Sequence, residues 1–193
     1  PFADSVVSFD LSREMVALVQ RTAAERGLNN IRAECGAAEA LPFEAASFDI
    51  VLTRFSAHHW VCIQTVAEQI MRVLKPGGKL VVIDVVTPQN ALLTTYMQSI
   101  ELLRDTSHVR NRSVSDWEAV LKREGFQSLA SRQWKLPLNF ANWVERMQTP
   151  AERVAAIVSL LQAAPQEVLE YFQVEADNSF VVDTAWMEAV KPA

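Results

Sequence analysis

The chain has 193 residues, of which half are apolar, and a formal net charge of -5 at pH 7. It is long enough for one globular domain with a hydrophobic core and too short for two large ones. The acidic balance argues against a nucleic-acid partner, and no apolar run approaches the roughly 20 residues that a membrane-spanning helix needs.

The first half of the chain alternates between predicted strands and helices. A buried strand from Val6 to Phe9 ends at Asp10, and Ser12 is a good N-cap for a helix that Gly27 stops. A weak strand over 31–35 and a strong strand over 48–52 follow. An apolar stripe then predicts a helix over 63–74, a turn at 75–78 and a strand over 80–83. These continuously apolar strands predict an α/β fold, with a Rossmann-like, mostly parallel, doubly wound sheet and helices on both faces.

The second half is richer in helix. We predict a helix over 91–103 and another that starts at a capping box of Ser115 and Glu118. Strands are expected over 128–138 and 179–182. Between them, residues 140–175 have helical patterns and form a helical insertion near the C-terminus, which is a candidate lid. The whole chain, residues 1–193, is predicted to be a single domain.

Polar residues follow the predicted strands, at the edge where open parallel sheets bind ligands. A carboxylate at Asp10 can accept both hydroxyl protons of a ribose, or it is an ordinary strand-end acid. The small residues of the loop 36–43 allow a flat ring to approach the backbone, or the loop is simply anchored by Leu41 and Phe43. His58 and His59 follow the third strand and suit general-base chemistry, or they are one core and one exposed histidine.

Taken in order, these motifs resemble a known family. They are Phe9-Asp10-Leu11-Ser12, Gly36 to Phe43, Ser47 to Val51, Arg54 with His58-His59, and Arg72 to Gly78. The stretch from Val6 to Val86 resembles the class I S-adenosylmethionine-dependent methyltransferases that act on small molecules, of the ubiquinone and menaquinone biosynthesis type. Residues 104–110 and 117–126 resemble an uncharacterised bacterial branch of that family.

The resemblance implies S-adenosylmethionine as cofactor and assigns its contacts. Asp10 binds the ribose, Leu11 packs on the adenine, and the backbone at Ala37 and Ala38 meets the adenine edge. Thr53 and Arg54 border the methionine part.

Two departures from the family stand out. Ala37 replaces the usual acid, which costs one hydrogen bond of ~0.5–1.5 kcal/mol net. The chain also opens at Pro1 without an initiator methionine and soon enters a strand. We therefore expect that the family's first strand and glycine-rich loop precede this sequence and are absent from it, and that a molecule without them binds little cofactor.

The acceptor site is predicted from the same strand ends. His58 or His59 would orient or deprotonate an oxygen or carbon of a small-molecule acceptor, and Arg104, His108 and Arg110 would help to bind it. Both arginines also fit a surface ion-pair cluster, which would contribute little. Trp134, Trp143 and Met147 either shape an apolar acceptor pocket or belong to the core.

Other functions remain open at the level of sequence. A nicotinamide-dependent oxidoreductase would also place an acid after the first strand, and a non-catalytic binding protein would explain the departures from the family. A metal site is not expected, because the side chains of adjacent histidines point in diverging directions. The absence of a signal peptide and the unpaired spacing of Cys35 and Cys62 predict a cytoplasmic protein without nucleic-acid or membrane partners. The oligomeric state is open, with a homodimer as one option.

Overall fold

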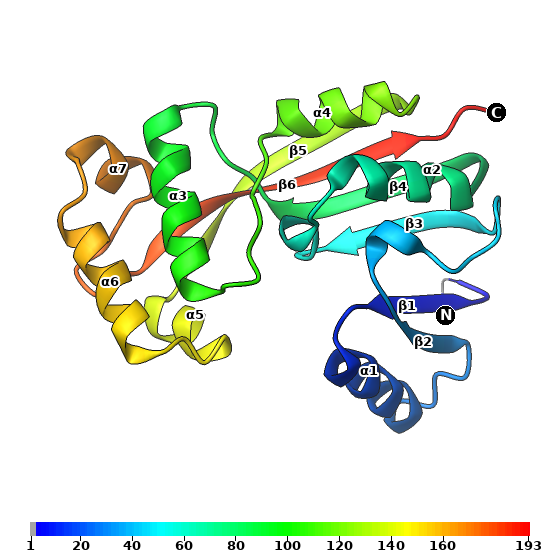
Figure 1. Cartoon of the computed structure of the whole chain (residues 1–193), viewed down its shortest axis with the longest axis horizontal. Coiled ribbons are helices and arrows are strands. Elements are labelled where there is room, and N and C mark those ends of the chain that lie inside the picture. The colour runs from blue at the N-terminus through cyan, green and yellow to red at the C-terminus, as the bar shows by residue number, and fades with distance from the viewer. Residues whose placement is uncertain (1–2) are drawn as a thin grey trace.

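A computed structural model describes residues 3–193 as β-sheets flanked by helices, which confirms the predicted α/β class (Figure 1). The strands are β1 (Val6–Asp10), β2 (Ile31–Cys35), β3 (Phe48–Arg54), β4 (Leu74–Val85), β5 (Gln127–Leu138) and β6 (Phe180–Val190). The α-helices are α1 (Arg13–Glu25), α2 (Ile63–Val73), α3 (Ala91–Arg104), α4 (Val114–Arg123), α5 (Phe140–Arg146), α6 (Ala151–Gln162) and α7 (Gln166–Tyr171). Two single 3₁₀ turns, η1 (Ala38–Ala40) and η2 (Ala57–His59), follow β2 and β3.

The strands form two sheets. β1 and β2 make a parallel pair, and the other four strands are ordered β3-β4-β6-β5. β3 and β4 are parallel, whereas β6 runs antiparallel to both of its neighbours. The sequence did not predict this antiparallel half, because hydrophobic periodicity identifies a strand but carries no information on its direction. The four-stranded sheet is therefore mixed, and the parallel pairs of the two sheets, β1–β2 and β3–β4, have the carboxyl ends where such sheets bind ligands.

Local signals identified most element boundaries. Ser12 caps α1 as predicted, since its hydroxyl accepts from the backbone N–H of Met15 at 3.2 Å. The predicted capping box was wrong: Ser113 and Asp116 form it instead, because the helix starts earlier than the Ser115 motif indicated. The predicted turn at 75–78 lies inside β4 as an irregularity, with Gly77 at a φ of 74°. The last strand extends to Val190, well beyond the predicted 182.

Two buried clusters divide the core. One lies between α2, α4 and the sheet and includes Val66, Leu80 and Trp117. The other packs α3 against the helical segment and the start of β6, and includes Met97, Ile157 and Val182. Each buried apolar side chain contributes roughly 1.5–3 kcal/mol, so the helical segment 140–175 is held firmly on α3 in this structure. Within residues 3–193, no helix combines the length and apolarity needed to cross a bilayer.

An apolar cleft separates β1 from β3. Each of these strands has a hydrogen-bonded neighbour on one edge only, and the cleft between them has a volume of about 180 Å³. Apolar side chains from both strands line it, among them Val7, Phe9 and Val51. Ile50 and Leu52 of β3 are 58% and 60% exposed. Exposed apolar side chains on a parallel strand are unusual, because parallel sheets normally have both faces covered. The strand expected before Pro1 is not tested by this structure and stays a prediction.

Replacing the exposed apolar residues of β3 tests this open face. In the 193-residue chain, we expect the double substitution Ile50→Thr and Leu52→Thr to change the free energy of unfolding by less than about 0.5 kcal/mol. Self-association at high protein concentration should fall, because an exposed apolar strand promotes it. Urea unfolding and light scattering measure the two effects. Val82→Thr is the control: Val82 is fully buried on β4, so its hydroxyl should cost roughly 1–3 kcal/mol. Equal destabilisation by both variants would show that the face of β3 is covered.

Candidate functional site

Asp10 lies at the end of β1, where it is held in place by its own turn. Its Oδ1 accepts from the backbone N–H of Ser12 at 2.8 Å, and its carbonyl accepts from the N–H of Gly36 at 3.0 Å. Among the described residues, Oδ2 has no hydrogen-bond partner. One carboxylate oxygen is thus fixed, and the other is free to accept from a ligand hydroxyl.

The loop after β2 is built around a group of three aromatic rings. Phe43 packs edge-to-face against Phe9, with ring centroids 5.5 Å apart, and against Phe48, at 5.1 Å. A Cβ at Gly36 would lie 2.5 Å from the Phe9 ring, so this packing requires glycine there. Arg72 of α2 donates to the backbone carbonyls of Leu41 and Phe43. The backbone of the loop is therefore anchored to α2, and the side chains of Leu41 and Phe43 are half-buried.

The predicted cofactor residues divide between two environments. Ala38 and Thr53 line the cleft between β1 and β3, whereas Asp10, Leu11, Ala37 and Arg54 are not among its lining residues. Leu11 is 74% exposed, and the guanidinium of Arg54 lies 5.0 Å from the ring centre of Phe55. All six residues lie at or just after the ends of β1, β2 and β3, and their cofactor roles stay predictions.

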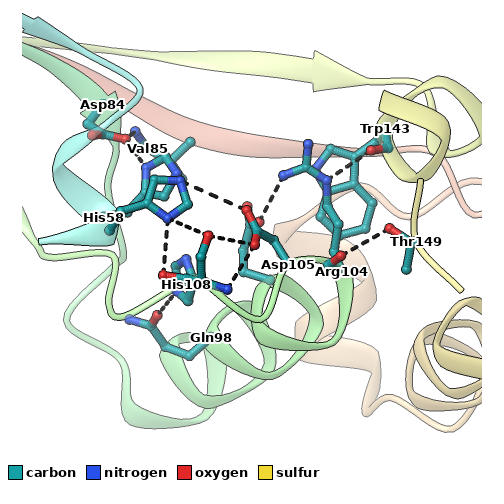
Figure 2. Close-up of polar contacts among 12 residues, drawn as sticks. His58, Asp84, Val85, Gln98, Arg104, Asp105, His108, Trp143 and Thr149 are labelled. Carbon is teal, nitrogen blue, oxygen red and sulfur yellow. Dashed lines mark hydrogen bonds and ion pairs between the residues drawn. The ribbon is translucent and has the colours of Figure 1, made fainter. Parts of the chain in front are cut away.

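His58 is held by a buried carboxylate (Figure 2). Its Nδ1 lies 2.7 Å from Oδ1 of Asp84, at the end of β4. Asp84 is buried and also accepts from the backbone N–H groups of Ala57 and Val85, each at 2.8 Å. The carboxylate is therefore fixed, and it holds the proton of neutral His58 on Nδ1. The Nε2 lone pair is left as a base.

The surroundings of His58 favour its charged form. Burial of the imidazole opposes protonation, but the hydrogen bond and the charge of Asp84 outweigh it, helped by the charges of Glu101 and Asp105. The pKa of His58 is consequently raised above its ordinary value of 6.5. Asp84 was missed by the sequence analysis, although its position after an apolar strand is the signal that singled out Asp10.

His59 lies beside His58 with its ring centre 4.2 Å away. The expectation that the two adjacent side chains diverge was wrong, because their rings are in contact at an interplanar angle of 49°. The Nδ1 of His59 lies 3.1 Å from the hydroxyl and from the carbonyl of Ser107, and its Nε2 lies 3.9 Å from Asp105. Within residues 3–193, no group of three or more His, Cys, Asp and Glu side chains is arranged to hold a metal ion.

His108 is a buried neutral imidazole next to this pair, 6% exposed, with its ring centre 5.7 Å from that of His58. Its Nε2 lies 2.8 Å from Oε1 of Gln98, which also accepts from the N–H of Asn111. The proton of His108 is therefore on Nε2, and its buried Nδ1 has no partner among the described residues. Burial, followed by the charges of His58 and His59, lowers the pKa of His108 to about 4.

The two predicted substrate arginines lie in different surroundings. Arg110 is exposed, 3.8 Å from Asp116, and its backbone N–H donates to the carbonyl of His58 at 3.0 Å. Arg104 is largely covered, with its side chain 12% exposed beside Trp143, on the far side of Asp105 from His58 in Figure 2. Trp143 belongs to the core and Trp134 is exposed, so these two do not form one acceptor pocket.

Comparison with known proteins gives a consistent assignment. The methyltransferase domain family matches residues 1–82. The uncharacterized protein YafE of Escherichia coli is 41% identical over 98% of this chain and 91% of its own length. The uncharacterized methyltransferase YcgJ of Bacillus subtilis is 33% identical over 89% of this chain and 68% of its own length.

A solved structure and a further sequence relative agree with this assignment. The crystal structure of YcgJ superposes with a TM-score of 0.95 and 30% identity, over 100% of this chain and 85% of that one. The demethylmenaquinone methyltransferase of Lactococcus lactis is 37% identical over 50% of this chain, but only 37% of its own length.

An NMR titration of the three histidines tests the geometry of the site without a substrate. We expect His58 to titrate above pH 6.5 and His108 near pH 4, with the His108 proton on Nε2 in the ¹⁵N shifts. Asp84→Asn removes the charge that favours the imidazolium and leaves its burial, so the pKa of His58 should fall below its ordinary value. Asp49→Asn, at an exposed pair with Lys75, is the control and should shift no histidine. An unchanged pKa of His58 in the Asp84→Asn variant would contradict the structure.

Proposed function

Because the chain belongs to the class I S-adenosylmethionine-dependent methyltransferases, we propose that it methylates an oxygen or carbon atom of a small-molecule acceptor, with His58 as the base. The observation that carries this proposal is the His58–Asp84 pair at the carboxyl ends of β3 and β4. The Lactococcus relative is named for demethylmenaquinone, a small molecule, which supports the acceptor class. Family membership sets aside the nicotinamide-dependent oxidoreductase.

S-adenosylmethionine, when bound, supplies a methyl group on a sulfonium, so the protein has to bind and align it. The free Oδ2 of Asp10 fits a ribose hydroxyl. The small side chains of Ala37 and Ala38 leave the backbone accessible to a flat ring. Thr53 and Arg54, at the end of β3, would border the methionine part.

The open edges of β1 and β3 belong to the same proposal. One further strand would pair with both edges and cover the apolar lining of the cleft. In this proposal, the strand and glycine-rich loop expected before Pro1 would fill the cleft. Such a loop would leave the sheet between Asp10 and Thr53, where the resemblance puts the cofactor's amino-acid end.

The chain itself would contribute a base that takes a proton from the acceptor and side chains that orient the acceptor. The Nε2 of His58 accepts the proton of an acceptor hydroxyl or acidic carbon, and Asp84 stabilises the imidazolium that results. His59, fixed by Ser107, lies beside this position and would orient the acceptor. His108 and Arg110 are proposed to contact the acceptor as well. The buried Nδ1 of His108 is an acceptor that a hydroxyl of a bound molecule would satisfy.

Cofactor binding tests the role of Asp10. Calorimetry with S-adenosylmethionine is run on the 193-residue chain and on the chain extended by its natural upstream residues. We expect the extension to raise the affinity and Asp10→Ala to lower it about 10- to 100-fold, the loss of hydrogen bonds to a charged group. Asp4→Ala, at an exposed acid before β1, is the matched control. An unchanged affinity in Asp10→Ala, or no binding by either chain, would contradict the assignment.

Turnover tests the histidines. A panel of phenols, quinones and small acids is screened for methylation, and the active acceptor is used with His58→Ala, His59→Ala and the double variant. We expect His58→Ala to lower kcat about 10²- to 10⁴-fold, the usual contribution of a general base. Because a base must be unprotonated, wild-type activity should rise with pH through the raised pKa of His58. Glu68→Gln, on the exposed face of α2, serves as control. Normal turnover by the double variant would rule out both histidines.

A further inference from the structure

Arg112 is a half-buried cation that has no acidic partner. It lies in the loop between α3 and α4 (Figure 1), and it forms no ion pair with a carboxylate of the described residues. Within residues 3–193, the one hydrogen bond that its guanidinium donates runs from Nη1 to the backbone carbonyl of Arg110, at a long 3.4 Å. A guanidinium has five N–H donors, and a partly covered cation is costly when those donors are unpaired. Most donors of Arg112 are therefore available to a ligand.

A second cation, Arg110, lies two positions earlier in the same loop. Arg112 forms a parallel bridge with Val86, so the loop is extended there, and in an extended chain this spacing puts both side chains on one side. Arg110 is exposed and lies 3.8 Å from Asp116, whose carboxylate also accepts from the backbone N–H of Ser113. Burial, followed by the charge of Arg110, lowers the pKa of Arg112. An anion between two such cations would relieve both effects.

The backbone fixes these two arginines next to His58. The N–H of Arg110 donates to the carbonyl of His58 at 3.0 Å, and the carbonyl of Arg112 accepts from the N–H of Thr87 at 3.3 Å. Arg110, Arg112 and His58 line the same crevice at the end of β4. The crevice is too narrow to hold a water molecule, so a ligand would reach the arginines from the solvent side. The fold thus holds two cationic side chains close to the residue proposed as the base.

We propose that Arg112, together with Arg110, binds an anionic group of the methyl acceptor, either a carboxylate or a phosphate. Both groups present at least two oxygens to the planar fork of a guanidinium. Asp84 also lines the crevice, but its two oxygens are already bound by His58 and by backbone N–H groups. The proposal rests on the methyl-transfer function proposed above, and it restricts the acceptor to small molecules that carry a negative charge.

Titration with inorganic phosphate and with acetate, at constant ionic strength, tests the site without turnover. The side-chain ¹⁵N–¹H signals of the arginines are followed by NMR. We expect saturable shifts at Arg110 and Arg112, and the anion that binds more tightly identifies the class. Arg112→Met should lower the affinity about 10-fold or more, the effect of losing a hydrogen bond to a charged group. Arg112→Lys keeps the charge but not the fork, and should lose less.

Arg123→Met is the matched control, because it removes an exposed cation from the far end of α4. It should leave the affinity for both anions unchanged. Three results would overturn the proposal: no saturable shift with either anion, an affinity that Arg112→Met does not change, or an equal loss in Arg123→Met. Where Arg112→Met fails to fold, the wild-type shifts and Arg112→Lys decide.

Turnover with matched acceptors completes the test. Each carboxylic acid or phosphate monoester is compared with its neutral amide or free alcohol. We expect Arg112→Met to raise KM for the acid about 10- to 100-fold with kcat little changed, because the arginine binds the anion equally in the ground and transition states. KM for the neutral analogue should not move, whereas a general loss of structure would affect both. Equal use of both acceptors by the wild type would overturn the proposal. A complete lack of methylation would refute the proposed function and leave the anion titration to decide this one.

Discussion

The burial of the Asp84 carboxylate is the constraint from which the rest of the site follows. A buried charge is stable only when it is paired and hydrogen-bonded. Here the partners are the backbone N–H groups of Ala57 and Val85 and the ring of His58. The first residues after β3 are thus tied to the end of β4, and the orientation of His58 is a consequence of satisfying Asp84.

The same turn fixes the next layer of the structure. The backbone carbonyl of His58 accepts from the N–H groups of Val109 and Arg110, which holds the loop after α3 against the histidines. Gln98 then binds both His108 and the backbone of Asn111 in that loop. A continuous chain of hydrogen bonds therefore links β4 to α3. The second core cluster extends that link to the helical segment, so that its position and the electrostatics of His58 share one scaffold.

The sequence predicted features that depend on neighbouring residues. It did not predict contacts between residues that are far apart in the chain. Ser12 caps its helix through a contact three residues away, and the apolar strands were recognisable from their composition. His58 was singled out by its position, but its partner Asp84 is 26 residues further on. Arg104 was grouped with the substrate residues because its motif lies beside His108. Only the packing of Trp143 shows that its guanidinium faces the helical segment.

The two sides of the proposed reaction centre, Asp10 and His58, differ in how rigidly the fold holds them. His58 is fixed by its hydrogen bond to the buried carboxylate of Asp84, whereas Asp10 lies on a two-stranded sheet that shares no strand pairing with the other sheet. In this structure the segment from Gly36 to Phe48 connects the two sheets, through the edge-to-face aromatic rings and the hydrogen bonds that Arg72 donates to the backbone of the loop. Group transfer needs the reacting atoms aligned closely, and small misplacements lower the rate steeply. Because β1 and β3 flank the open cleft, the strand proposed to pair with both would set the distance between Asp10 and His58. Under the proposed function, occupation of the cleft would decide whether Asp10 and His58 can act on the same bound molecules.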